Sequence, residues 1–430
     1  MELGRIAEQA KQDAGRKFHS IAHLLTKEAL WEAFDSLRKD AAAGVDGVTC
    51  EQYAEHLIGN ISKLHEKLTS MTYRALPLRR IYIDKEDGRK RPISIPALED
   101  KIVQKATVAL LNAIFEQDFL DCSHGSRPGR SAQDALDDVG RVVCRAPTEY
   151  VLELDVVSYF DSIVRTQLME MIEGRVSDAS ILRLIRKWIN VGVVDDGRLL
   201  ESETGTGQGQ VISPLLANIY LHHVLDVWFA EQVTPRLKGK ASMIRYVDDA
   251  LLFFQYREDA QRVLEVLHKR FAKFGLTLHP EKTRLVEFGR RAHARATRMK
   301  TKTATFDFLG LTHRCATSRK GKFTVYVSTM KKRLKRGLTA IADWCRRHRH
   351  DPVDFQQRIL NAKLRGHYQY YGRPTNYRSL CKFFRGVRST WRKWLARRTR
   401  GKRLTWETFA KLLQRHPLLL PRITHTWTAR

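Results

Sequence analysis

The segment Met243-Ile-Arg-Tyr-Val-Asp-Asp-Ala-Leu-Leu-Phe-Phe254 places two adjacent carboxylates, Asp248 and Asp249, between two apolar runs that favour β-structure. This pattern predicts a hairpin whose turn presents paired negative charge. Two carboxylates that repel each other can form a phosphoryl-transfer site when they share magnesium ions with a nucleoside triphosphate. Asp-Asp is also an ordinary turn dipeptide, so the interpretation needs support from other parts of the chain.

A third carboxylate, Asp155, follows a second apolar run, Tyr150–Val157, which is typical of a buried strand. Two-metal chemistry requires carboxylates from separate elements that hold two cations roughly 3.5–4 Å apart. Asp155 meets this requirement if its strand lies beside the hairpin that carries Asp248. Alternatively, Asp155 caps the following helix. Asp161, a few residues later, is interpreted as a structural cap or ion-pair partner.

Positive charge dominates the composition, with 76 Lys and Arg against 47 Asp and Glu, a net charge of +29. Such an excess causes self-repulsion in a compact chain, so a polyanionic partner is expected. The basic residues recur through most of the chain, which favours a long phosphate-lined groove over a detachable tail. A merely solubilising surface is the alternative, but charges of mixed sign would serve that purpose. We therefore expect nucleic acid as the partner.

The length of 430 residues allows a large core and two or three domains. The six cysteines are far apart and include no Cys-x-x-Cys pair, which argues against a zinc finger and a disulfide framework. No apolar run approaches the ~20 residues that a membrane crossing needs. We expect a cytoplasmic protein with no membrane partner; the oligomeric state stays open.

Secondary-structure patterns divide the chain. Residues 78–96 predict a basic hairpin around the turn Asp87-Gly88, and a helix is expected at about 98–118. Strands and helices then alternate from 150 to about 327, including a helix over 214–232. Beyond 328 the pattern is helical, with an apolar stripe opposite a basic face that favours phosphate contact over simple solvation. The stripe consists of Met330, Leu334, Leu338, Ile341, Trp344 and Cys345.

Eight short blocks occur in order between about residues 40 and 315, with weaker similarity reaching near 427. They are Ala43-Gly-Val-Asp-Gly-Val-Thr49, Arg91-Pro-Ile-Ser-Ile-Pro96, Ser123-His-Gly-Ser-Arg-Pro-Gly-Arg-Ser131, Leu154-Asp-Val-Val-Ser-Tyr-Phe-Asp161, Gly205-Thr-Gly-Gln-Gly-Gln-Val-Ile-Ser-Pro214, Arg245-Tyr-Val-Asp-Asp249, Gly275-Leu-Thr-Leu-His-Pro-Glu-Lys-Thr283 and Phe306-Asp-Phe-Leu-Gly310. In this order they resemble the bacterial group II intron-encoded reverse transcriptases, also called intron maturases.

The resemblance implies a right-hand polymerase fold of the α/β class. An N-terminal helical extension (1–62) would precede the fingers and palm (63–314), and an all-α thumb and maturase-like basic region (315–430) would follow. The implied reaction is DNA synthesis on an RNA template, which adds deoxynucleotides from dNTPs to a primer 3′-hydroxyl with two Mg²⁺ ions. The implied partners are the RNA template and primer, group II intron RNA and a DNA target.

The resemblance also implies roles for the carboxylates and for one lysine. Asp155, Asp248 and Asp249 match the metal-binding triad, and the Val156 carbonyl matches a further metal ligand. Lys282 is similar to the lysine that protonates the leaving pyrophosphate, a general-acid role suited to an ammonium group near phosphate. A plain surface lysine is the alternative for that position.

Other matching positions face the substrate. Lys90 and Arg91 resemble the fingertip cations that grip the triphosphate, and Gln208 resembles the residue that contacts the incoming nucleotide. Phe160 matches the bulky residue that packs under the sugar and disfavours a 2′-hydroxyl. Arg127 is interpreted as shaping the template path, with a plain turn as the alternative.

Two positions depart from the common pattern, one further block matches it, and one module is not recognisable. Val247 stands where alanine is usual, and Gly207 stands where proline is usual and adds loop freedom. Phe308-Leu-Gly310 is similar to the primer-grip turn. No His-Asn-His endonuclease module with paired Cys-x-x-Cys ligands is recognisable, so self-sufficient cleavage of a target strand is not expected.

Two alternatives stay open. One is a host-adopted reverse transcriptase, serving phage defence or a CRISPR array, with the same catalysis on another template. The other is a binding-only maturase, which clamps structured intron RNA and assists its splicing without chemistry of its own. A binding-only protein could lose its carboxylates without cost, so the presence of all three favours activity.

Overall fold

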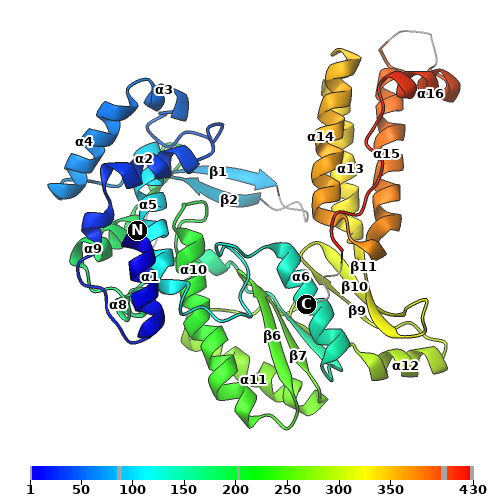
Figure 1. The fold of residues 1–430 in the computed structure, drawn as a ribbon, viewed down its shortest axis with the longest axis horizontal. Coiled ribbons are helices and arrows are strands. Elements are labelled where there is room, and N and C mark those ends of the chain that lie inside the picture. Colours follow the sequence, from blue (N-terminus) through cyan, green and yellow to red (C-terminus); the bar gives the residue numbers. More distant parts are fainter. Residues whose placement is uncertain (1, 85–89, 201–203, 399–403, 427–430) are drawn as a thin grey trace. The chain divides into compact units, whose positions relative to one another are not determined.

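The computed structural model describes residues 2–84, 90–200, 204–398 and 404–426. The chain forms two compact units and passes between them several times (Figure 1). Unit 1 comprises residues 1–131, 152–252 and 256–285, and unit 2 comprises residues 132–151, 253–255 and 286–430. The expected functional boundaries after residues 62 and 314 do not coincide with these crossings and stay predictions.

Unit 1 begins with helices, and the helix expected at 98–118 is confirmed as α5. The elements of this part are α1 (Glu2–Gln12), η1 (Ala22–Leu24), α2 (Lys27–Ser36), α3 (Cys50–Ala54), α4 (Leu57–Thr69) and α5 (Leu98–Phe115). Both α1 and α2 pack on α5. The buried guanidinium of Arg175 pairs with Asp118 at 2.9 Å and donates to backbone carbonyls at and after the end of α1. These bonds tie the N-terminal helix to the rest of the unit.

The basic hairpin predicted over 78–96 is confirmed as β1 (Leu78–Asp84) and β2 (Lys90–Ile95), which pair antiparallel. Its expected turn at Asp87-Gly88 lies outside the described residues. β4 (Val193–Asp195) runs parallel to β1, and β5 (Arg198–Leu200) completes a sheet of order β2-β1-β4-β5.

A second sheet has the order β6-β7-β3-β8, with β6 (Ala241–Tyr246), β7 (Asp249–Phe254), β3 (Tyr150–Leu154) and β8 (Arg284–Glu287). The predicted hairpin is confirmed, although Val247 and Asp248 alone form its turn and Asp249 opens β7. The strand expected to reach Val157 ends at Leu154, and Val156 forms only an isolated bridge with Leu278. Because β3 lies next to β7, the order of the strands brings two of the predicted carboxylate-bearing segments to neighbouring strands.

Unit 1 contains further helices, and the last of them lies beside β6 and β7 (Figure 1). They are α7 (Tyr159–Ser162), α8 (Arg165–Glu173), α9 (Ala179–Asn190), α10 (Ser213–Leu221), the π-helical η2 (His222–Asp226) and η3 (Trp228–Val233), η4 (Thr234–Arg236) and α11 (Arg257–Lys273). The helix predicted over 214–232 is therefore α-helical only in its first half. Its second half adopts the wider π form, which is rare and occurs frequently at functional sites.

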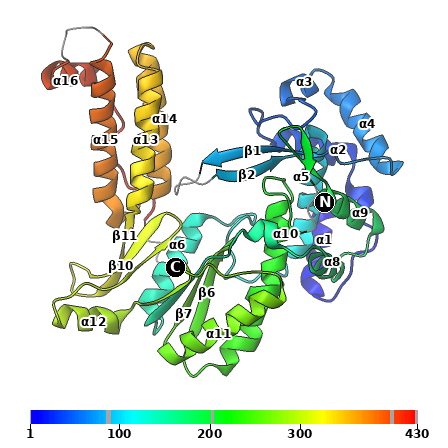
Figure 2. The same ribbon diagram turned by 180° about the vertical axis from the view of Figure 1, so that it is seen from behind.

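Unit 2 combines a sheet of order β11-β10-β9 with helices (Figure 2). Its elements are α6 (Ala132–Arg145), α12 (Arg290–Arg298), β9 (Thr305–Phe308), β10 (Leu311–Thr317), β11 (Phe323–Thr329), α13 (Lys331–Arg347), α14 (Val353–Tyr371), η5 (Pro374–Asn376), α15 (Tyr377–Leu395) and α16 (Trp406–Arg415). The helical part begins at Lys331, so the end of β10 and all of β11 lie in the region expected to be all-α. The predicted class, α/β followed by a helical C-terminal region, is otherwise confirmed.

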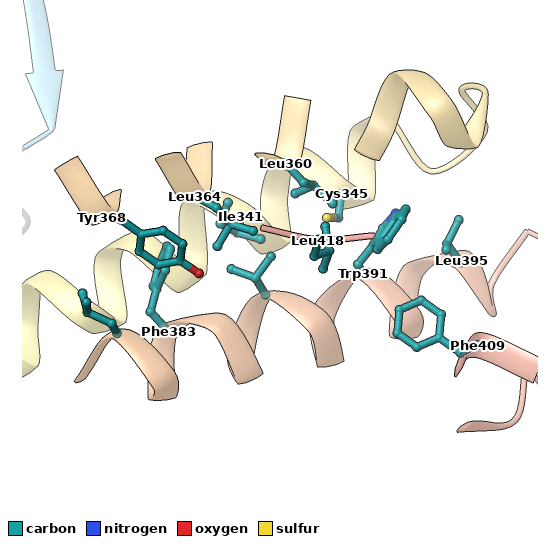
Figure 3. Close-up of a cluster of buried hydrophobic side chains, with 12 residues drawn as sticks. Ile341, Cys345, Leu360, Leu364, Tyr368, Phe383, Trp391, Leu395, Phe409 and Leu418 are labelled. Carbon is teal, nitrogen blue, oxygen red and sulfur yellow. The ribbon is translucent and has the colours of Figure 1, made fainter. Parts of the chain in front are cut away.

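The apolar stripe predicted on α13 faces a hydrophobic core made by α13, α14 and α15 (Figure 3). Ile341 and Cys345 are buried in it, while Leu334, Leu338 and Trp344 pack against it. Met330, the sixth residue of the predicted stripe, precedes α13 as its N-cap residue. Within the described ranges, no helix combines the length and hydropathy that a membrane crossing requires.

Candidate active site

The Val247-Asp248 turn joins β6 to β7 in a strained conformation. Val247 has φ +59°, in the left-handed region that β-branched residues rarely adopt. Asp248 is half-buried, and Asp249 is exposed at the start of β7. Burial raises the pKa of the Asp248 carboxyl above its ordinary value, and the charge of Asp155 raises it further, while a backbone hydrogen bond and the cations Arg91 and Arg245 lower it. Asp155 and Asp248 are thus close enough to repel each other.

Asp155 is held by the segment that contains Lys282. The Lys282 ammonium lies 3.0 Å from Oδ2 and 3.3 Å from Oδ1 of Asp155, and the backbone N–H of His279 donates to the Asp155 carbonyl at 2.8 Å. The alternative in which Asp155 caps the next helix is wrong, because Ser158 occupies the N-cap position of α7. Lys282 is exposed, yet it is paired with one of the predicted metal ligands rather than standing apart as a plain surface lysine.

The loop that carries Gln208 is fastened to β2. Nε of Arg91 donates to Oε1 of Gln208 at 3.2 Å, and the backbone N–H of Ser94 donates to the Gln208 carbonyl at 2.7 Å. Gly209 has φ +116°, and a Cβ there would lie 2.7 Å from the Ser94 carbonyl oxygen. Glycine is required at this close approach. The structure therefore brings together Arg91 and Gln208, two residues predicted to contact the nucleotide.

Phe160 belongs to the same loop system. Its carbonyl accepts a hydrogen bond from the Thr206 N–H at 2.8 Å, and its half-buried ring packs 5.6 Å from the ring of Tyr159. A Cβ on Gly205 would lie 2.9 Å from the Phe160 carbonyl oxygen, so this glycine also allows the close approach. The glycine-rich loop thus links the predicted sugar-contacting residue to the predicted nucleotide-contacting glutamine.

Oxygen donors dominate the site, which is the ligand chemistry that Mg²⁺ prefers. Asp155 and Asp248 interact electrostatically, and the ammonium of Lys282 already occupies a cation position on Asp155. Among the residues that the structure describes, however, no group of three or more acidic, histidine or cysteine side chains gathers tightly enough to hold a metal. The donor set fits magnesium, while the full triad, the Val156 carbonyl as a ligand and the role of exposed Lys90 stay predictions.

Comparison with known proteins adds an independent observation. The family model described as "Reverse transcriptase (RNA-dependent DNA polymerase)" matches residues 83–313, more than half of the chain. The chain belongs to the reverse transcriptase family. This family generally uses divalent metal ions.

Relatives of this reverse transcriptase include proteins named for introns. It is 36% identical over 253 residues to Protein YkfC of Escherichia coli, covering 56% of this chain and 64% of that protein. It is 30% identical over 283 residues to the group II intron-encoded protein LtrA of Lactococcus lactis, covering 62% of this chain and 46% of LtrA. Nuclear intron maturase 4 of Arabidopsis thaliana is 25% identical over 199 residues, which are 45% of this chain and 23% of that protein. The resemblance to group II intron-encoded proteins is confirmed, although this chain covers less than two thirds of each of these relatives.

One predicted role in the reverse transcriptase domain is contradicted. Arg127 was expected to shape the template path, but its guanidinium is buried. It forms an ion pair with Glu116 at 3.0 Å and donates to the carbonyls of Leu120 and Ser123, each at 2.8 Å. Arg127 therefore braces the segment 116–127 from within and does not present its charge to a strand of nucleic acid.

Sequence reasoning quoted Arg245 in a motif but assigned it no role, and it passed over Asp226 and Asn218. All three side chains are buried, and Arg245 and Asp226 form a fully buried ion pair. One signal could have indicated that Arg245 has buried partners, although not which residues they are. Arg245 is the one charged residue in the β6 sequence Ala-Ser-Met-Ile-Arg-Tyr, and a charge inside a buried strand needs a buried partner.

Proposed function

We propose that this chain is an RNA-directed DNA polymerase that adds deoxynucleotides from dNTPs to a primer 3′-hydroxyl on an RNA template. The observation that carries the proposal is the arrangement around Asp248. Asp155 and Arg91 both act on its carboxyl electrostatically, which supports one site within unit 1 for the acidic residues and the loop system of Arg91 and Gln208. Membership of the reverse transcriptase family supports the same reaction.

In this proposal Asp155, Asp248 and Asp249, with the Val156 carbonyl, hold two Mg²⁺ ions. When bound, such ions lower the pKa of the attacking hydroxyl and neutralise charge on the departing pyrophosphate. The ammonium of Lys282, which is paired with Asp155 in the structure, donates a proton toward the pyrophosphate as it leaves.

The remaining residues position the nucleotide. Lys90 and Arg91 bind the triphosphate, and Gln208 contacts the nucleotide while Arg91 orients its side-chain amide. Phe160 packs under the sugar, where a bulky ring disfavours a 2′-hydroxyl and so selects deoxynucleotides. Its attachment to Thr206 couples this selection to the position of the Gln208 loop.

Primer extension on an RNA template tests the proposal. Asp248→Ala is expected to abolish extension while RNA affinity stays within about twofold of the unaltered protein, because removing one carboxylate disrupts metal binding but not the basic surface. Asp35→Ala is the matched control, since Asp35 is an exposed carboxylate with only a 3.6 Å helix-surface pair to Lys39. Extension that survives in Asp248→Ala would overturn the assignment.

We further propose that group II intron RNA is the natural partner, that the protein assists intron splicing, and that a DNA target serves in mobility. The names of LtrA and of the Arabidopsis maturase support this, as does the net charge of +29. A splicing assay with Asp248→Ala separates the two roles, because RNA binding does not need the carboxylate. Splicing that is lost together with extension would count against a separate binding role. A gene with no folded intron RNA around it would favour the host-adopted alternative.

A further inference from the structure

The turn that carries Asp248 does not hold its shape by local preference. Val247 is β-branched and adopts φ +59°, a conformation that persists only when surrounding contacts over-determine it. Its neighbours Tyr246 and Asp248 are only half-buried, so the turn is not simply enclosed by the core. Some specific set of contacts must hold Val247 in place.

Arg245 supplies one such contact from inside the protein. Its Nη1 donates to the Val247 carbonyl at 2.8 Å and to Oδ1 of Asn218 at 2.9 Å. Its Nε and Nη2 donate to the two carboxylate oxygens of Asp226 at 2.8 and 2.5 Å. The guanidinium thus binds the backbone two residues beyond Arg245, while Asp226 binds the guanidinium through both carboxylate oxygens.

Asn218 contacts the turn indirectly, through the backbone of Gly125. Its Nδ2 donates to the Gly125 carbonyl at 2.7 Å, and a Cβ on Gly125 would lie 2.5 Å from the Val247 nitrogen. Arg245 also pairs with this segment through its backbone, donating to the Cys122 carbonyl at 2.7 Å and accepting from the His124 N–H at 2.9 Å. One fully buried amide therefore connects the guanidinium to the backbone that presses on Val247.

Stability alone does not account for this arrangement. A fully buried ion pair loses much of its attraction to desolvation, and apolar residues of similar volume often stabilise a core equally well. Asp226 moreover lies at the end of a π-helical turn, a form that occurs often at functional sites. A network that is costly to bury and is bonded to the strained residue is better explained by the geometry that it imposes.

We propose that Arg245, Asn218 and Asp226 are positioning residues that hold Val247 in the left-handed conformation and thereby aim the carboxylate of Asp248 for nucleotidyl transfer. The proposal rests on the proposed polymerase function, which makes Asp248 a catalytic residue. It assigns no direct contact with substrate to the three residues. Loss of the network should slow the chemical step because the carboxylate is misplaced, even where the protein stays folded and binds its substrates.

The test is a coupling measurement between Asn218 and Val247 by single-turnover addition of one nucleotide. Here kcat denotes the maximal rate of addition, and KM denotes the dNTP concentration that gives half of that rate. Asn218→Ala is expected to lower kcat at least tenfold with the KM for dNTP changed less than threefold. In a Val247→Gly background, where glycine adopts positive φ without steric cost, the same Asn218→Ala change should lower kcat less than threefold. A purely structural role would give the same loss in both backgrounds, and that result would overturn the proposal.

Leu221→Ala is the matched control, because Leu221 is buried on the same helix and its side chain has no hydrogen-bonding group. It should lower the Tm at least as much as Asn218→Ala while leaving kcat within about threefold. If Asn218→Ala does not fold, Asn218→Ser takes its place, since a hydroxyl is too short to reach both partners. If the unaltered protein fails to extend primers, the proposed function is wrong. If Asn218→Ala has the same kcat as the unaltered protein, the positioning network alone is wrong.

Discussion

Nζ of Lys282 lies 3.0 Å from Oδ2 of Asp155, so a lysine forms an ion pair with the carboxylate that is proposed to bind magnesium. Both side chains are partly exposed, at 54% and 31%, and such pairs contribute only about 0.2–1 kcal/mol to stability. The pairing is therefore better understood through catalysis than through folding. It places a proton donor and a metal ligand in contact before substrates arrive.

The first prediction concerns the rate. Lys282→Ala should lower kcat for primer extension by roughly 10²-fold or more, since general-acid catalysis typically contributes 10²–10⁴-fold. The Tm should change by less than about 2 °C, because an exposed pair stabilises little. Lys282→Arg is the control that keeps a cation beside Asp155 but is a poor proton donor, so its kcat should also be low. Full activity in Lys282→Arg would argue against proton donation.

The same pair predicts that Lys282→Ala binds metal more tightly, although it reacts more slowly. Removing the ammonium of Lys282 frees Asp155 from a competing cation, so Lys282→Ala should bind Mg²⁺ more tightly, by about threefold or more. Titration of the protein with Mg²⁺ by calorimetry measures this without any turnover. Lys282→Arg retains the competitor and should leave the affinity close to that of the unaltered protein. Weaker binding in Lys282→Ala would mean that the lysine supports the metal site and does not compete with it.

Arg91 and Gln208 should act as one unit in binding the nucleotide. Their side chains are joined by a 3.2 Å hydrogen bond, so loss of either partner should raise the KM for dNTP by about 5–20-fold. The double change Arg91→Ala with Gln208→Ala should cost less than the product of the single changes, which is the mark of a direct interaction. Arg198→Ala, an exposed arginine in β5 of the same sheet, serves as the control. Strictly multiplicative effects would show that the two residues act separately.

The pKa of Asp248 predicts the acid limb of the activity profile. Burial raises this pKa, and the carboxyl must be ionised to bind a metal, so activity should be lost at a higher pH than for an ordinary aspartate. Arg91 lowers the same pKa, so Arg91→Ala should shift the acid limb of kcat further upward. The profile should be measured at saturating dNTP, which removes the binding defect. A downward shift would contradict the assigned electrostatics.

How far the sequence predicted this site depended on the kind of interaction. Asp155 and Asp248 were recognisable because each follows or interrupts an apolar strand, and the strand order then placed their segments side by side. Arg127 was misjudged because its partner Glu116 lies on the preceding segment, and nothing in an Arg-Pro-Gly turn indicates that the guanidinium points inward. The partner of Arg245 could not be deduced, because Asp226 reaches it only through a π-helical turn that helical periodicity does not reveal.

The basic face of α13 yields the last prediction. Lys331, Lys332 and Lys335 are exposed on α13, and we expect them to contact phosphates. For a single-stranded RNA, each lost contact reduces the steepness of log affinity against log salt by about 0.7. Replacing all three lysines with alanine should therefore reduce this steepness by about 2. Arg38 and Arg186 form the control, because each is already paired with a carboxylate and should contribute little. If the triple variant keeps the full slope while the Arg38 and Arg186 changes reduce it, the RNA does not lie along α13.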